Sequence, residues 1–86
     1  MDAPALGITR YYFHLRDGDF RTVDEIGNEF ESLNLAELAA LTVISNLMGE
    51  SPLWLLELEA PHIEICDGSG KVLSSLPFPV IRKVIN

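Results

Sequence analysis

The sequence predicts an α+β domain in which one sheet carries a single helix on one of its faces. Two strand-like stretches joined by a turn precede a helical stretch, and two more strand-like stretches follow it. When strands lie on both sides of one helix in the chain, a single sheet covered by that helix is the economical packing. We therefore expect the order β-β-α-β-β and a four-stranded, mainly antiparallel sheet.

The first hairpin is expected within residues 8–23. Residues 8–16 alternate and are rich in aromatic and β-branched side chains, as strands are. The dipeptide Asp17-Gly18 is a strong signal for a tight turn. Residues 29–31 are expected as a short extended piece at a sheet edge. The side of the first strand that should face the core carries Tyr11, Phe13 and Leu15.

The helix is expected to run from about Leu35 to Met48. Asn34 is a good N-cap, and Glu37 stands three residues further on, as in a capping box. Gly49 is the expected C-terminal stop. The stripe expected to face the sheet consists of Ala36, Ala40, Val43, Ile44 and Leu47, with Leu41 and Met48 flanking it.

Two leucines, Leu35 and Leu38, fall on the polar side of this helix. Either the apolar segment 53–56 covers them, which is the favoured interpretation, or they form an exposed patch that marks an interface. The segment 51–60 is compatible with a helical turn, a loop held by Trp54, or the lead-in to a strand.

The second hairpin begins at Pro61 and returns over residues 72–78. Residues 67–70, Asp-Gly-Ser-Gly, form its loop, and the prolines on either side of Phe78 end it because proline cannot donate to a ladder. Ile63 and Ile65 should face one side of the sheet. The other side should carry His62, Glu64 and Cys66.

Eighty-six residues correspond to one domain. We expect a flexible leader over residues 1–7 and a single domain over residues 8–86, with a last helical turn within residues 80–86. Hydrophobic residues make up 48% of this short chain. A thin core and many apolar residues favour a second apolar surface, which suits a homodimer or a protein partner.

The charge balance excludes several classes of function. There are 13 acidic and 6 basic residues, giving a net charge of −7. Nucleic-acid binding needs clustered basic residues, and anionic lipid would be repelled for the same reason.

The chain lacks a signal-peptide pattern and an apolar stretch that could span a membrane. Its single cysteine, Cys66, cannot form an internal disulfide, so we expect a cytoplasmic protein.

No catalytic or cofactor-binding pattern is present. The acidic residues around the first turn are explained by turn formation and solubility, and the loop at 67–70 precedes a strand rather than a phosphate-binding helix. The candidate binding site is a polar sheet face made of His14, Arg16, His62 and Glu64. Imidazole and carboxylate groups are zinc ligands, but no pair has local ligand spacing, so no metal is expected.

Several short motifs make a set in a characteristic order. They are the stretch from Arg10 to Gly18, Asp24-x-x-Gly27-x-Glu29, an alanine-containing helix, Asp67-Gly68-x-Gly70-x-Val72-Leu73, and Leu76-Pro77-Phe78. Over roughly residues 10 to 78 the chain resembles the bacterial family called domain of unknown function 6894. The resemblance implies a small, intracellular, single-domain bacterial protein, and it supplies no activity, cofactor or catalytic residue.

The sequence does not specify a function. The favoured hypothesis is a small non-enzymatic interaction or regulatory module that acts through protein–protein contacts. The alternative is a small-molecule or metal-binding protein that uses the polar sheet face. An enzyme is the weakest of the three readings.

Overall fold

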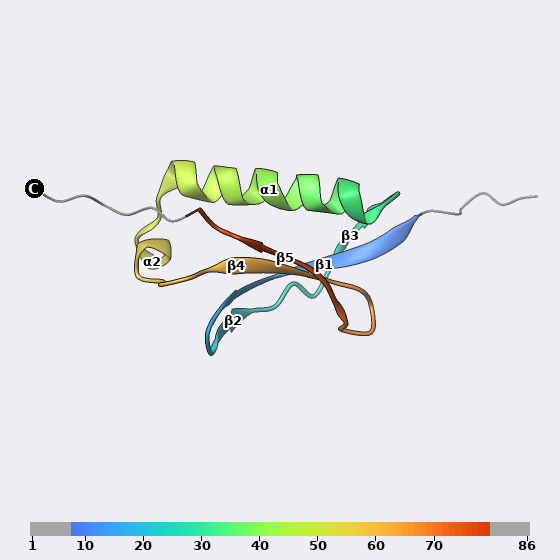
Figure 1. The fold of residues 1–86 in the computed structure, drawn as a ribbon, viewed down its shortest axis with the longest axis horizontal. Coiled ribbons are helices and arrows are strands. Elements are labelled where there is room, and N and C mark those ends of the chain that lie inside the picture. Colours follow the sequence, from blue (N-terminus) through green and yellow to red (C-terminus); the bar gives the residue numbers. More distant parts are fainter. Residues whose placement is uncertain (1–7, 80–86) are drawn as a thin grey trace, which may run out of the picture.

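One long helix lies across a single antiparallel sheet (Figure 1). The computed structural model describes residues 8–79, so the expected leader 1–7 and the expected helical turn within 80–86 lie outside the described residues. The strands are β1 (Thr9–Asp17), β2 (Phe20–Thr22), β3 (Asn28–Phe30), β4 (His62–Cys66) and β5 (Val72–Pro77). The helices are α1 (Leu33–Glu50) and α2 (Leu53–Leu56).

The expected α+β class and the packing of one main helix on the sheet are confirmed. Strands follow the order β2-β1-β4-β5, and β3 pairs with β1 as well, which makes a fifth strand. All the pairings are antiparallel. The short α2 settles part of the segment 51–60, which takes the form of a helical turn.

Two short strands share one edge of β1. β2 pairs with its C-terminal end, from Leu15↔Thr22 to Asp17↔Phe20, and β3 pairs with its N-terminal end around Arg10↔Glu29. Phe30 anchors β3, because its ring stacks on that of Phe13 with centroids 5.9 Å apart. The middle of β1 therefore has a loop, and not a strand, along this edge.

On its other edge, β1 pairs with β4 over five residues, and β4 pairs with β5. Between β4 and β5 the register shifts, because Ile65 lies opposite Ser74 while Cys66 lies opposite Val72. Alternation along β1 and β4 buries Tyr11, Ile63 and Ile65 beneath the helix, as the sequence predicts for that face.

The helix begins two residues earlier than expected. Ser32 is the N-cap, and its Oγ accepts from the backbone N–H of Leu35 at 3.1 Å. Asn34, the expected cap, is inside the helix. At the other end the helix passes Gly49 and closes at Ser51, whose φ of 47° is in the left-handed region and whose N–H donates to the Leu47 carbonyl.

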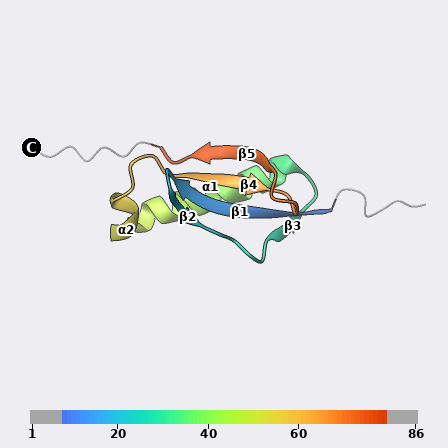
Figure 2. The same ribbon diagram turned by 90° about the horizontal axis from the view of Figure 1, so that it is seen from below.

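The helix face that meets the sheet is narrower than expected. Ala36, Ala40 and Ile44 are buried, and small alanines allow the helix to lie close to the strands. Val43 and Leu41, expected in or beside the buried stripe, are 40% and 47% exposed. Figure 2 shows why the stripe is narrow, since α1 crosses the sheet diagonally and does not run along one strand.

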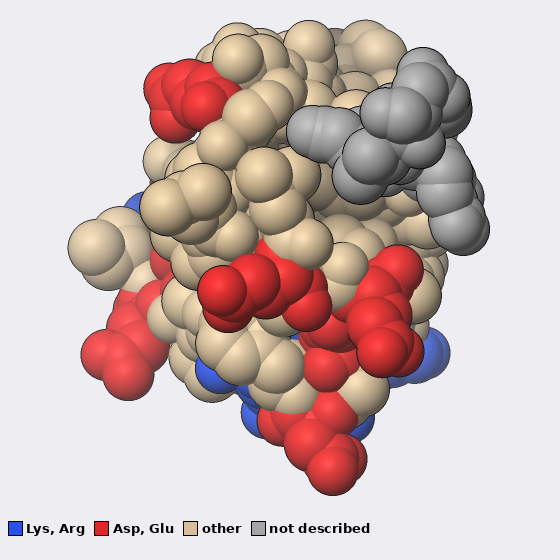
Figure 3. All heavy atoms as spheres, turned by 90° about the vertical axis from the view of Figure 1, so that its left-hand side faces the viewer, with Lys and Arg blue, Asp and Glu red and all other residues tan. Residues whose placement is uncertain are grey.

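The short helix α2 lies at the end of the molecule where α1 terminates (Figure 1). Leu55 inserts into the core, while Leu53, Trp54 and Leu56 stay exposed. Figure 3 shows this end of the molecule, with acidic side chains concentrated toward the sheet side and mostly uncharged atoms toward α1. Within residues 8–79, no helix is long and apolar enough to cross a membrane.

Candidate functional site

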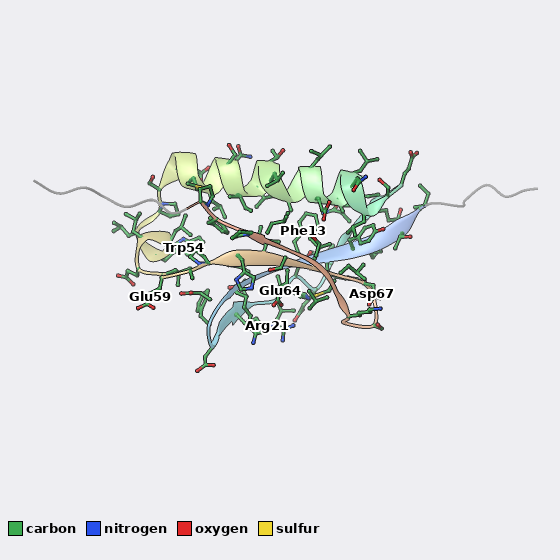
Figure 4. The ribbon with its side chains drawn as sticks, viewed as in Figure 1. Phe13, Arg21, Trp54, Glu59, Glu64 and Asp67 are labelled. Atoms are coloured by element: carbon green, nitrogen blue, oxygen red, sulfur yellow. The ribbon has the colours of Figure 1, made fainter. Side chains whose placement is uncertain are left out.

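The four candidate binding residues lie together on the sheet face that is turned away from α1. In the register of β1 and β4, His14 lies opposite Glu64 and Arg16 lies opposite His62. Residues opposite one another on antiparallel strands share a face. In Figure 4, Glu64 and Arg21 project from this polar face, whereas Phe13 lies between the sheet and α1.

Glu64 is the centre of this group. Its carboxylate lies 3.8 Å from Arg16 Nη1 and 3.5 Å from His62 Nε2. Arg16 is also held at the tight turn, where its Nε donates to the Gly18 carbonyl at 3.1 Å. The Glu64 carboxylate therefore has two partners within the domain: Arg16 on the neighbouring strand and His62 on its own strand.

His14, a candidate binding residue of the polar sheet face, is buried. Only 6% of the residue is exposed. Its Nδ1 accepts a hydrogen bond from the backbone N–H of Asp24 at 3.0 Å. An imidazole nitrogen that accepts cannot carry a proton, so this contact selects the neutral form with the hydrogen on Nε2.

The Asp24 carboxylate accepts a hydrogen bond from the middle of β1, where neither β2 nor β3 is paired with it. Its Oδ2 accepts from the backbone N–H of Phe13 at 3.1 Å, in the gap between β2 and β3. Its Oδ1 accepts from the N–H groups of Ile26 and Gly27, both at 3.0 Å. Burial alone would raise the pKa of Asp24, but these three backbone donors hold the pKa below its usual value.

Gly27 completes the same loop. Its φ is +73°, and a Cβ built there would lie 2.8 Å from Tyr12 Cε2 and 2.9 Å from the Tyr11 carbonyl oxygen. The second of these contacts is with backbone and cannot be relieved by a side-chain movement. Only glycine fits at this position without a shift of the loop or of β1.

The other acidic turn residues also hold loops in place by accepting hydrogen bonds. Asp17 accepts from the backbone N–H groups of Glu59 and Ala60 at 3.0 and 2.9 Å, which ties the end of β1 to the approach to β4. Asp67 Oδ1 accepts from Ser69 and from Lys71 within the β4–β5 loop. Ser69 and the backbone of Lys71 outweigh the small effect of burial and lower the pKa of Asp67.

Cys66 ends β4 on the polar face but is buried, with 1% of its surface exposed. Burial raises the pKa of its thiol, and the Glu64 carboxylate raises it further, against a smaller opposing effect of Arg21. Among residues 8–79 no three or more His, Cys, Asp or Glu side chains gather in a way that could hold a metal ion.

The acidic residues of both hairpins thus act on the backbone, and the motifs that contain them are loop-building motifs. The model of a domain of unknown function, DUF6894, matches residues 10–79. The chain belongs to this family. No curated protein and no solved structure matches the chain.

The resemblance noted from the sequence is therefore confirmed, and the fold gives the DUF6894 motifs a physical meaning. Asp24-x-x-Gly27 is the loop that completes the edge of β1, because the carboxylate and the glycine are both required there. Asp67-Gly68-x-Gly70 is the β4–β5 turn, in which Gly70 adopts a φ of +92°. These residues hold the loops of the fold in place.

The outer face of α1 has the exposed patch that was the less favoured of the two interpretations of Leu35 and Leu38. Leu35 and Leu38 were expected beneath residues 53–56, but they are exposed, Leu38 by 60%. This expectation is wrong because α2 begins directly after Ser51 and so lies at the far end of the helix. We define the α1 outer face as the exposed residues Leu35, Leu38, Leu41, Thr42, Val43, Ser45 and Asn46.

Proposed function

We propose that this protein is a non-enzymatic interaction module that binds another protein chain through the α1 outer face. The observation that carries the proposal is the lack of charge on this face. α1 contains two charged residues: Glu37, which is half-buried, and Glu50, which is exposed in the last turn, one turn beyond the end of the face at Asn46. The Glu37 carboxylate accepts from Ser74 Oγ at 2.6 Å, so it is turned toward the sheet.

A solvent-facing helix surface ordinarily carries charged residues opposite its buried stripe. Here four large aliphatic side chains take their place, and the exposed leucines and tryptophan of α2 follow at the end of the helix. Depletion of charge at an apolar surface is typical of the centre of a protein–protein interface. Burying such a surface contributes about 25 cal/mol for each Å² removed from water.

The chemistry of the chain also suits a protein partner better than other large partners. The net charge of −7 opposes binding to nucleic acids and to anionic lipid. The family resemblance and the single buried thiol of Cys66 support a place in the bacterial cytoplasm, where thiols stay reduced. This location is part of the proposal.

A second candidate function is the binding of a small molecule or metal at the polar sheet face. The convergence of His14, Arg16, His62 and Glu64 on two neighbouring strands favours it. It ranks second because Glu64 is paired with Arg16 and His62, and because His14 Nδ1 already accepts a backbone hydrogen bond. Titration with zinc, followed by the NMR signals of both imidazoles, tests it. Unchanged signals at millimolar zinc would remove the metal version.

Site-specific photo-cross-linking in the native cell tests the leading proposal. A cross-linking amino acid at position 38 should give a covalent adduct with a protein, because Leu38 is the most exposed of the four large aliphatic residues of this face. The matched control carries the same amino acid at position 69, in the exposed β4–β5 loop. An equal yield of adducts at the two positions, or none at 38, contradicts the proposal.

A further inference from the structure

The outer edge of β5 is a long strand edge that no described strand covers. β5 has six residues and ends the strand order, whereas the opposite edge of the sheet is divided between two three-residue strands and a loop. Short or interrupted edges are a common protection against unwanted pairing. The β2–β3 edge is interrupted in this way, whereas β5 is continuous, and its outer edge is limited only near its ends, by Pro77 and by the register shift opposite Ile65 and Cys66.

One hydrogen bond shows which main-chain N–H and carbonyl groups of β5 point outward from the sheet. Phe78 N–H donates to the Pro61 carbonyl at 2.9 Å, which makes 61 and 78 a hydrogen-bonded pair. Hydrogen-bonded and non-hydrogen-bonded pairs alternate along an antiparallel ladder, so the main chain of Ser75 and Pro77 faces away from β4. Pro77 has no N–H, but at this position an N–H would point away from β4, so no bond to β4 is lost. Among residues 8–79, the main-chain N–H and carbonyl of Ser75 point outward from the sheet without a strand partner.

The helix above this edge presents an uncharged stripe on the flank beside β5. Because Glu37 contacts Ser74, the Glu37 side of α1 is the side nearest β5. Leu41, one turn after Glu37, lies on that flank, and Val43 lies on the opposite flank. The stripe recurs with the spacing 4-3-4-3 that is typical of helix-to-helix packing. It consists of Asn34, Leu38, Leu41, Ser45 and Met48.

We propose that the partner of this surface is a second copy of the chain, joined by antiparallel pairing of β5 with its counterpart around a two-fold axis near Ser75. The pairing would give one continuous sheet through both copies. The two α1 helices would then meet along the flanks that carry Leu38 and Leu41, so the Val43 side of the α1 outer face would stay outside this contact. This inference rests on the proposed interaction function and names its occupant.

Two physical arguments select a second copy. An added peptide strand would satisfy the edge of β5 but leave the α1 flank bare, whereas a second copy brings both a strand and a helix to the same layers. Each copy also carries a charge of −7, so association must avoid charged surfaces. β5 contains no charged residue and the stripe contains none, which makes this face suited to contact between like-charged molecules.

Sedimentation of the full chain over about 1 μM to 1 mM tests the inference, together with two matched pairs of variants. Ser75→Pro removes the outward N–H without removing a bond to β4, and Ser75→Ala keeps it. Leu41→Glu places a charge on the β5 flank, and Val43→Glu places the same charge on the other flank. Circular dichroism identifies any variant that fails to fold.

A concentration-dependent dimer is expected, weakened at least about tenfold by Ser75→Pro and Leu41→Glu and less than about twofold by their controls. Raising the salt from about 0.05 to 0.5 M should strengthen it, since screening reduces the repulsion between like charges. A monomer at all concentrations overturns the inference. A dimer that resists Ser75→Pro and Leu41→Glu but is broken by Val43→Glu also overturns it.

These outcomes are separable from the failure of the proposed function. A cross-link from position 38 to a different protein, with a monomeric chain in solution, would keep the interaction function and remove the second copy as its partner. An adduct with twice the mass of the chain supports both.

Discussion

The backbone N–H of Asp24 donates to His14 Nδ1 while the Asp24 carboxylate accepts from the backbone N–H of Phe13, next to His14. The two contacts act on neighbouring residues of β1, in the interval that neither β2 nor β3 covers. Polar groups in a buried strand must find partners, and here one residue satisfies two of them. The loop is thereby joined to the middle of the sheet.

Replacing Asp24 by Asn should destabilise the domain by about 1–3 kcal/mol, because the amide group would present a donor to a backbone N–H donor. One amide oxygen can still accept from Ile26 and Gly27, so the rest of the loop is retained. Urea unfolding measures the difference. Asp19→Asn removes the same charge from an exposed position and should change the stability by less than about 0.5 kcal/mol. Equal effects of the two substitutions would contradict the role given to Asp24.

Acid should weaken the domain through the same carboxylate. The pKa of Asp24 is lowered in the folded state, so its contribution to stability is complete above the unfolded value of about 3.9 and is lost as the pH falls through the folded value. Asp24→Asn lacks this titration, while the lowered pKa of Asp67 is common to both proteins and cancels. Urea midpoints of the two proteins should therefore converge below about pH 4. Curves that stay parallel down to pH 2 would count against the assignment.

The imidazole of His14 should have its hydrogen on Nε2 and not on Nδ1. The tautomer follows from the Asp24 N–H that points at Nδ1, and nitrogen chemical shifts from a long-range ¹H–¹⁵N spectrum report it directly. A hydrogen on Nδ1 would show that the contact is not made.

The same contact predicts the effect of removing the imidazole. His14→Phe leaves the Asp24 N–H without its acceptor and should cost about 1–3 kcal/mol. His62→Phe is the matched control, because that ring is partly exposed and makes only long contacts of 3.5 Å, with Glu64 and with the Ala60 carbonyl, each worth about 1 kcal/mol or less. A larger loss for His62 than for His14 would reverse our interpretation of the polar face.

The parts of the fold that rest on local chemistry were predictable from the sequence. Alternation placed Tyr11 in the core of the sheet, and Asp17-Gly18 gave the first turn, because a period of two and a positive φ are properties of a few neighbouring residues. The same reasoning placed His14 and Glu64 on one face. It could not show that His14 is buried, because the group that buries it belongs to a loop ten residues further along.

The helix shows where local reasoning ends. Both Ser32 and Asn34 are good caps, and the chain's exit from β3 selects Ser32. The exposure of Leu35 could not be decided by composition, because a helix with so few charged residues has no obvious solvent face. Covering it with residues 53–56 required those residues to return about 24 Å along the helix, since 16 residues separate Leu35 from Ser51. α2 begins too soon after Ser51 for that return.

The two glycines with similar φ should respond differently to alanine. Gly27→Ala combines a left-handed backbone with contacts of 2.8 to 2.9 Å to β1 and should cost more than about 2 kcal/mol. Gly18→Ala has the same conformational penalty of about 1 kcal/mol or slightly more, but nothing lies within 4 Å of its Cβ. Thermal unfolding of both variants measures the difference. Equal losses would mean that the loop at Gly27 does not approach β1 as closely as the structure has it.

Cys66 provides a built-in probe of the polar face. The thiolate is the reactive form of cysteine, and burial together with Glu64 raises the pKa of this thiol. Iodoacetamide should therefore modify Cys66 at least about 100-fold more slowly in the native protein than in urea, because reaction requires the domain to open. A double variant, Cys66→Ser with Thr42→Cys on the exposed side of α1, should react at nearly the same rate in both conditions. Asp24→Asn should speed the reaction of Cys66 and leave that of the exposed thiol unchanged. Rapid native labelling of Cys66 would show that β4 is not covered on this face.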